Sequence, residues 1–132
     1  MAYRLADDEA LLTALREALA GRQTMGSQRE LRQRVLAELR KIDPGLTVGG
    51  PRLRRLAITS GIARIEIEWR ESDRRKARSR CPVCQSQLKP TRNETVFGGT
   101  VTLGFRCPKC PFSSTLNRRE PTRYIFTKKA QQ

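Results

Sequence analysis

The chain contains no histidine, few aromatic residues and few acids. Among its 132 residues, Phe, Trp and Tyr make up 5%, and 13 Asp and Glu stand against 27 Lys and Arg. A catalytic zinc site keeps an open coordination position and usually includes His or a carboxylate among its ligands. The lack of histidine therefore speaks against such a site. No Gly-rich phosphate loop or nucleophile motif is present either, so we expect neither an enzyme nor a small-molecule substrate.

The sequence also lacks long hydrophobic runs. No apolar stretch approaches the roughly 20 residues that a membrane-spanning helix needs. Residues 1–8 lack the apolar core of a signal peptide. No segment combines a basic face with a large apolar one, the pattern typical of a helix that lies on a membrane surface. We therefore expect a cytoplasmic protein with no membrane partner.

What the chain does contain is four cysteines, in the segments Cys81-Pro82-Val83-Cys84 and Cys107-Pro108-Lys109-Cys110. Two Cys-x-x-Cys turns can place four thiolates at the corners of a tetrahedron, the geometry that Zn²⁺ adopts in structural sites. Four thiolates leave no position for an activated water. We therefore predict one structural Zn²⁺ on these four residues. A disulfide pair is the alternative interpretation, and the reducing cytoplasm favours the metal.

The segment between the two cysteine pairs carries a hairpin signal. Gly98-Gly99 separates the β-rich runs Thr95-Val96-Phe97 and 100–106. Together with the cysteine pairs, this pattern resembles a zinc ribbon. In that family the cysteine turn often reads Cys-Pro-x-Cys-Gly, and this chain has Gln85 and Pro111 where that Gly would stand. The resemblance implies a small β domain over residues 81–132.

In the N-terminal half, capping residues and hydrophobic periodicity predict three helices and two strands. Asp7 can cap the first helix, Ser27 and Glu30 form a capping box for the second, and Pro51 suits the start of the third. The expected elements are helices over 7–20, 28–41 and 51–58, with strands over 46–48 and 62–70. The expected inner faces hold Leu11, Leu12, Leu15, Ala18 and Leu19, then Leu31, Val35, Leu39 and Ile42, then Leu53, Leu56 and Ala57, and finally Ala63, Ile65, Ile67 and Trp69.

This order of elements resembles a winged helix-turn-helix module, in which the third helix enters the DNA major groove. The resemblance implies that Arg52, Arg54 and Arg55 face phosphates or base edges. A wing also needs a hairpin, whose second strand would come from residues 75–80 or from the ribbon. A small α+β support domain, with arginines that serve only as a solvated surface, fits the same pattern.

We therefore expect an α+β protein with a winged-helix-like domain over 1–70, a basic linker over 71–80 and a zinc ribbon over 81–132. The linker holds five basic residues and no large apolar one. It would either lie along phosphates or act as a solvated tether.

The net charge of +14 and the pI near 11.0 indicate a nucleic-acid partner. Residues 81–132 hold nine Lys and Arg against two Glu. Aromatic residues lie among these cations, where they could stack on unpaired bases or form the core of the ribbon. The predicted nucleic-acid contacts are Arg52, Arg54, Arg55, Arg74, Arg75, Lys76, Arg78, Arg106, Lys109, Arg118 and Arg119.

A winged helix joined to a Cys₄ zinc ribbon resembles archaeal-type transcription proteins, including the transcription initiation factor E family. The likeness implies a transcription-related role on DNA, beside RNA polymerase. An RNA- or ribosome-associated protein fits the same charge and ribbon. A protein-interaction adaptor, in which the ribbon docks on a partner, is the third hypothesis.

Overall fold

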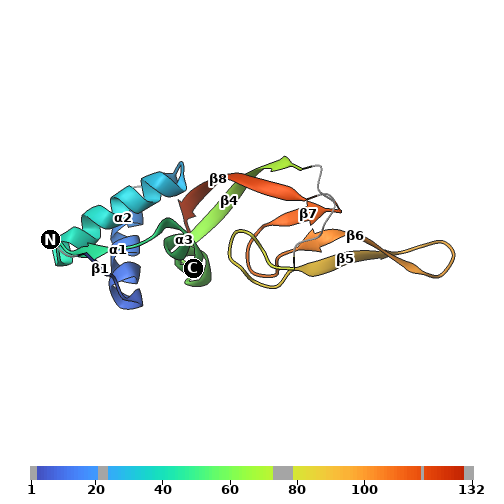
Figure 1. The fold of residues 1–132 in the computed structure, drawn as a ribbon, viewed down its shortest axis with the longest axis horizontal. Coiled ribbons are helices and arrows are strands. Elements are labelled where there is room, and N and C mark those ends of the chain that lie inside the picture. The colour runs from blue at the N-terminus through green and yellow to red at the C-terminus, as the bar shows by residue number, and fades with distance from the viewer. Residues whose placement is uncertain (1–2, 21–23, 73–78, 117, 130–132) are drawn as a thin grey trace. The chain divides into compact units, whose positions relative to one another are not determined.

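A computed structural model describes residues 3–20, 24–72, 79–116 and 118–129 of the chain. The chain divides into unit 1, residues 1–66 and 123–132, and unit 2, residues 67–122. Unit 2 is thus an insertion between two parts of unit 1 (Figure 1). The expected α+β class is confirmed. Each helix among the described residues is too short or too polar to span a bilayer.

The three helices begin at the predicted capping signals. Helix α1 spans Asp8–Ala20, and the Asp7 carboxylate accepts a hydrogen bond from the Ala10 N–H at 2.8 Å. Helix α2 spans Gln28–Ile42, and the Ser27 hydroxyl accepts from the Glu30 N–H at 3.1 Å. The Glu30 carboxylate accepts from the Gly26 N–H at 3.0 Å. Helix α3 spans Gly50–Thr59, with a proline in its first turn.

The helices bury most of the apolar faces that the sequence predicts. The buried residues are Leu11, Ala14, Leu15, Ala18 and Leu19 of α1, Leu31, Val35, Leu36 and Leu39 of α2, and Leu53 and Ala57 of α3. The prediction for Ile42 is wrong, because its side chain is 57% exposed. Ile42 is the last residue of α2, directly before the turn at residues 43–45. At this end of the helix, no neighbouring element among the described residues covers the Ile42 side chain. Leu36 is buried in this helix instead.

Two small sheets contain the strands of unit 1. Strand β1 (Arg4–Leu5) pairs in parallel with β3 (Leu46–Thr47). Strands β2 (Thr24–Met25), β8 (Arg119–Lys128) and β4 (Ala63–Glu71) form the second sheet in the order β2-β8-β4. Met25 pairs with Phe126, and both side chains are fully buried. The end of the chain therefore supplies part of the core around the N-terminal helices.

Strand β4 confirms the predicted alternation only in its first half. Ala63 and Ile65 are each 7% exposed, whereas Trp69, also predicted on the buried face, is 47% exposed. Residues from 67 onward belong to unit 2, so β4 leaves the helical core before it reaches Trp69. The Arg119 guanidinium covers the indole instead, 4.6 Å from the ring centroid.

Unit 2 contains an antiparallel sheet in the order β5-β6-β7. These strands span Lys89–Glu94, Thr100–Arg106 and Ser113–Thr115. The predicted turn at Gly98-Gly99 is confirmed, but residues 95–97, predicted as a strand, lie in the loop. Gly98 has φ +87°, and the Thr95 N–H donates to the Gly99 carbonyl at 2.7 Å. Closing the hairpin at Thr95 places Val96 and Phe97 at its tip.

Candidate metal centre and basic surface

The first cysteine turn is closed by backbone hydrogen bonds. The Gln85 N–H donates to the Cys81 carbonyl at 2.9 Å, and the Cys81 N–H donates to the Ser86 carbonyl at 2.8 Å. Gln85 has φ +67°, a left-handed conformation that favours glycine. A glycine would adopt this conformation without the steric cost that the Gln85 side chain brings. The second turn is closed by the Cys107 N–H, which donates to the Phe112 carbonyl at 2.9 Å.

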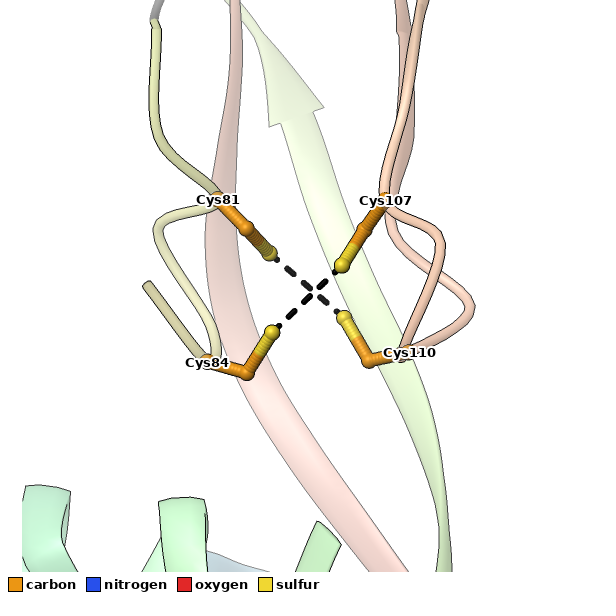
Figure 2. Close-up of side chains that lie close together, drawn as sticks. All are labelled: Cys81, Cys84, Cys107 and Cys110. Carbon is orange, nitrogen blue, oxygen red and sulfur yellow. Dashed lines mark hydrogen bonds between the residues drawn. The ribbon is translucent and has the colours of Figure 1, made fainter. Parts of the chain in front are cut away.

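The four cysteine side chains point their sulfurs toward a common centre (Figure 2). All four Sγ atoms lie within 4.8 Å of one another. The distance between the Sγ atoms of Cys81 and Cys110 is 3.5 Å, and that between the Sγ atoms of Cys84 and Cys107 is 3.4 Å. Zn–S bonds of about 2.3 Å in a tetrahedron require sulfurs about 3.8 Å apart. The cluster therefore fits one zinc ion after a small adjustment, and all four cysteines are free thiols.

Backbone N–H groups point at two of the sulfurs from equivalent positions. The Val83 N–H lies 3.4 Å from the Cys81 sulfur, and the Lys109 N–H lies 3.4 Å from the Cys107 sulfur. Each donor is two residues after its cysteine, so both turns use the same local geometry. Hydrogen bonds to a sulfur favour its thiolate, the form that binds metal.

Hydrogen bonding between thiols and burial shift the pKa values of Cys81, Cys107 and Cys110. A hydrogen bond from Cys110 lowers the pKa of Cys81 to about 5, against the effect of burial. The same contact, followed by burial, raises the pKa of Cys110. Burial is the main cause that raises the pKa of Cys107. A divalent cation would replace these shared protons, and zinc binding should therefore release protons.

The chemistry of the donor set indicates a single structural zinc. Four sulfur donors favour zinc over the hard cations that prefer oxygen ligands. A complete shell of four protein ligands leaves no open position for a substrate or water. The cysteines are also largely buried, and only Cys110 is partly exposed. The predicted ligands Cys81, Cys84, Cys107 and Cys110 are thus brought together as one site.

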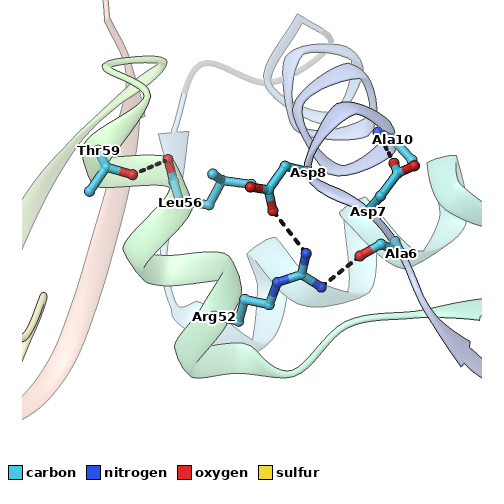
Figure 3. A network of polar contacts seen from close by, with 7 residues as sticks. All are labelled: Ala6, Asp7, Asp8, Ala10, Arg52, Leu56 and Thr59. Carbon is cyan, nitrogen blue, oxygen red and sulfur yellow. Dashed lines mark hydrogen bonds and ion pairs between the residues drawn. The ribbon is translucent and has the colours of Figure 1, made fainter.

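The α3 arginines lie in two different environments. Arg54 is only 9% exposed; its guanidinium donates to the Gln28 amide oxygen at 2.7 Å and lies 4.6 Å from the Tyr124 ring centroid. Arg54 is therefore buried, and its guanidinium does not project toward phosphates or base edges as the winged-helix resemblance implies. Arg52 donates to the Ala6 carbonyl at 2.6 Å and to the Asp8 carboxylate at 2.9 Å (Figure 3). The side chains of Arg52 and Arg54 thus link α3 to other parts of unit 1. The third arginine, Arg55, is half-buried.

The side chains of Arg118 and Arg119 also contact residues close to them in the fold. Arg118 lies 4.0 Å from the Glu120 carboxylate, with 25% of its side chain exposed. Arg119 is 18% exposed, lies 4.0 Å from the Glu71 carboxylate, and donates to the Ser113 carbonyl at 3.2 Å. These two side chains are therefore less accessible to a partner than their charge alone suggests. The predicted contacts Arg74, Arg75, Lys76 and Arg78 lie outside the described residues.

A different set of cations is exposed on the β5–β6 hairpin and the second cysteine turn. Lys89 and Arg106 are cross-strand partners, and both are exposed. Arg92 on β5 and Lys109 beside the metal site are exposed as well. None of the four side chains forms a hydrogen bond or ion pair with a residue in the described part of the chain. Lys89 and Arg92 were not among the predicted contacts, although the sequence places both between the two cysteine pairs.

The aromatic residues divide between core and surface. Phe112 is 3% exposed and Phe126 fully buried, so both belong to the protein core. Phe105 and Tyr124 are half-buried. Phe97 is 98% exposed at the hairpin tip. Of these five aromatics, only Phe97 presents its whole ring to a partner.

Comparison with known protein families, curated proteins and solved structures produced no match.

Proposed function

We propose that this is a zinc-containing nucleic-acid-binding protein that acts on DNA in transcription. The zinc ion holds the two cysteine turns together, and the β5–β6 hairpin that joins them presents cations to the phosphate backbone. RNA polymerase is the protein partner that the resemblance to transcription proteins implies. No chemical step is assigned to the metal, because all its coordination positions would be filled by sulfur.

The observation that carries the proposal is the pairing of Lys89 with Arg106. Like charges directly opposite each other on a sheet destabilise it, and neither residue has an acidic partner in the described chain. A phosphate between the two side chains would remove the repulsion and accept hydrogen bonds from both. The arrangement is unfavourable for the protein alone and favourable for a complex with a polyanion.

The fold of unit 1 supports DNA as the target. Three helices precede β4, and β4 lies next to β8 in the sheet, which supplies the adjacent strands that a wing requires. Arg55 is the α3 arginine with which such a module could contact DNA. Arg52 and Arg54 would instead hold α3 in place, since their guanidinium groups are engaged within unit 1.

The test is the salt dependence of DNA binding by the full zinc-loaded chain. Fluorescence anisotropy with a labelled duplex, between about 50 and 200 mM salt, should show affinity falling steeply as salt rises. The double variant Lys89→Gln, Arg106→Gln should reduce the slope of log K against log salt by about 2, one for each phosphate contact.

A matched control removes the same charge elsewhere. Arg4 and Lys41 form ion pairs with Asp43 and Glu38 in unit 1. The double variant Arg4→Gln, Lys41→Gln should leave the slope nearly unchanged. An equal loss of slope in both double variants would show that only net charge matters, and no binding to DNA or RNA would reject the proposal. Preference for RNA of the same sequence would reassign the target to the RNA- or ribosome-associated class.

Salt-insensitive capture of a single protein from nuclease-treated lysate would instead favour the adaptor function. Loss of all partners after nuclease treatment would exclude it. The two outcomes separate a role based on the hairpin cations from one based on ribbon docking.

A further inference from the structure

The outer half of the β5–β6 hairpin is a two-stranded arm. Among the described residues, β7 pairs with residues 104–106 of β6, which leaves β5 as the one neighbour of residues 100–103 in this sheet. In Figure 1 the loop between β5 and β6 reaches well past β7. The arm ends in Val96 and Phe97, which are 97% and 98% exposed.

The tip is held in shape by its own hydrogen bonds. The Gly98 N–H donates to the Thr95 carbonyl at 3.2 Å, and the Gly99 N–H donates to the Thr95 hydroxyl oxygen at 3.1 Å. The Thr95 hydroxyl in turn donates to the Gly99 carbonyl at 3.1 Å. The two apolar side chains are therefore presented by an ordered turn, which lowers the entropy that a partner must remove on binding.

We propose that the hairpin tip binds an unpaired nucleotide of DNA, with the base stacked on the Phe97 ring. This inference rests on the proposed function and names the form of nucleic acid that unit 2 recognises. Every base has a flat π-face, so an exposed aromatic side chain can bind unpaired strands without sequence preference. Bases within an intact duplex are already stacked on their neighbours and would not offer that face.

Charge along the arm favours a polyanion as the occupant. Lys89 and Arg106 lie at the inner end of the hairpin, where β6 also pairs with β7, and Arg92 lies midway along β5. Glu94 is the one acid among residues 89–106. The exposed cations Lys89 and Arg92 lie at two points along β5, on either side of a register shift between Thr91 and Arg92. Cations spaced along the hairpin suit a strand that runs along it.

The length of the β5–β6 hairpin distinguishes nucleic acid from an anionic membrane. Strand β6 has seven residues, which at about 3.4 Å each corresponds to roughly 20 Å between its two ends. In a duplex each DNA strand carries one phosphate per about 3.4 Å of helix axis, and an unpaired strand can extend further per nucleotide. A strand stacked on Phe97 can therefore continue to the Lys89–Arg106 pair. If the tip were inserted into a membrane instead, the lipid headgroups around it would lie far from the Lys89–Arg106 pair.

The experiment compares Phe97→Ala, Phe97→Tyr and Val96→Ala in the full zinc-loaded chain. The probes are a labelled single strand, its duplex, and a duplex with a central unpaired bubble, measured by fluorescence anisotropy. We expect Phe97→Ala to weaken binding to the single strand and the bubble by about 5- to 140-fold, which corresponds to 1–3 kcal/mol per stacked base. Phe97→Tyr should retain binding because the ring remains, and Val96→Ala should change it little.

The salt slope separates this proposal from the proposed function. Phe97 neutralises no phosphate, so Phe97→Ala should leave the slope unchanged, whereas Lys89→Gln, Arg106→Gln should reduce it. If Phe97→Ala binds the single strand and the bubble as tightly as the wild-type chain, the tip proposal is wrong while the proposed function stands. If the chain binds no nucleic acid, both are wrong.

Two other occupants of the tip are tested with the same variants. Loss of binding to anionic lipid vesicles in Phe97→Ala, with nucleic-acid binding intact, would assign the tip to a membrane and overturn the proposal. Dissociation of a dimer by Phe97→Ala in light scattering, with nucleic-acid binding intact, would assign it to a second copy of the chain. Unchanged zinc content would show that each variant is folded in unit 2, as the exposure of Phe97 leads us to expect.

Discussion

Lys89 and Arg106 lie directly opposite each other on β5 and β6, with no acidic partner among the described residues. Replacing Lys89 with Glu would turn a repulsive cross-strand pair into an attractive one. We expect Lys89→Glu to raise the free energy of unfolding of unit 2 by about 0.2–1 kcal/mol and to weaken DNA binding. Denaturant unfolding and fluorescence anisotropy on the same sample measure the two effects. If the free energy of unfolding and the DNA affinity both rose or both fell, the result would contradict a binding role for this pair.

Removal of zinc should unfold unit 2 and spare the helices of unit 1. The metal joins the turns at Cys81–Cys84 and Cys107–Cys110, and structural zinc contributes about 10–16 kcal/mol in zinc-finger peptides. After chelation, amide hydrogen exchange should lose protection in β5 and β6 while α1, α2 and α3 keep theirs. Cys84→Ser should have a similar effect without chelator. Persistent protection of β5 and β6 in the metal-free protein would show that the metal is not structural.

Gly104 is required because β6 and β7 approach closely at this residue. A Cβ there would lie 2.1 Å from the Ser114 carbonyl oxygen and 3.0 Å from the Thr115 Cα. We expect Gly104→Ala to lower the stability of unit 2 by about 1–3 kcal/mol or more, because backbone must move to make room. Gly99→Ala is the control, since its nearest neighbour, the Thr95 hydroxyl oxygen, would lie at 3.6 Å. Thermal unfolding of zinc-loaded samples should affect only the first variant strongly.

Arg54 should act mainly in stability. Its guanidinium contacts both Gln28 and the Tyr124 ring, and its burial leaves little of it for a partner. We expect Arg54→Ala to destabilise unit 1 by about 2 kcal/mol, because the half-buried amide of Gln28 loses a partner and a cation–π contact disappears. Arg55→Ala should change stability much less and DNA affinity more. Equal stability of the two variants in urea would contradict this division of roles.

Gln85 occupies a backbone conformation that glycine adopts more easily. The left-handed region costs a non-glycine residue about 1–2 kcal/mol, and Gln85 has φ +67°. We expect Gln85→Gly to stabilise unit 2 by about 1 kcal/mol, after the larger unfolded-state entropy of glycine is taken into account. Gln85→Ala should give no gain, since alanine also has a Cβ. Chemical unfolding of the zinc-loaded variants would measure both.

The sequence determined the metal site and the local elements. Cysteine spacing is a covalent property of the chain, so four thiolates in two short turns could be assigned to zinc without a structure. Helix starts were readable for the same reason, because the capping groups at Asp7 and Ser27 lie within three residues of the N–H groups they accept from. The hairpin turn at Gly98-Gly99 was a local signal of the same kind.

Only the tertiary structure decided where the charges and the last strand belong. Charge in a sequence does not reveal which arginines are buried, so Arg54 resembled an exposed contact until its partners Gln28 and Tyr124 were known. The pairing of β2 with β8 joins residues about 100 positions apart, and no local pattern encodes it. Phe97 shows the same limit, since its position at the tip depends on where β5 and β6 pair. Such long-range contacts arise from packing of the whole chain, and local propensity does not specify them.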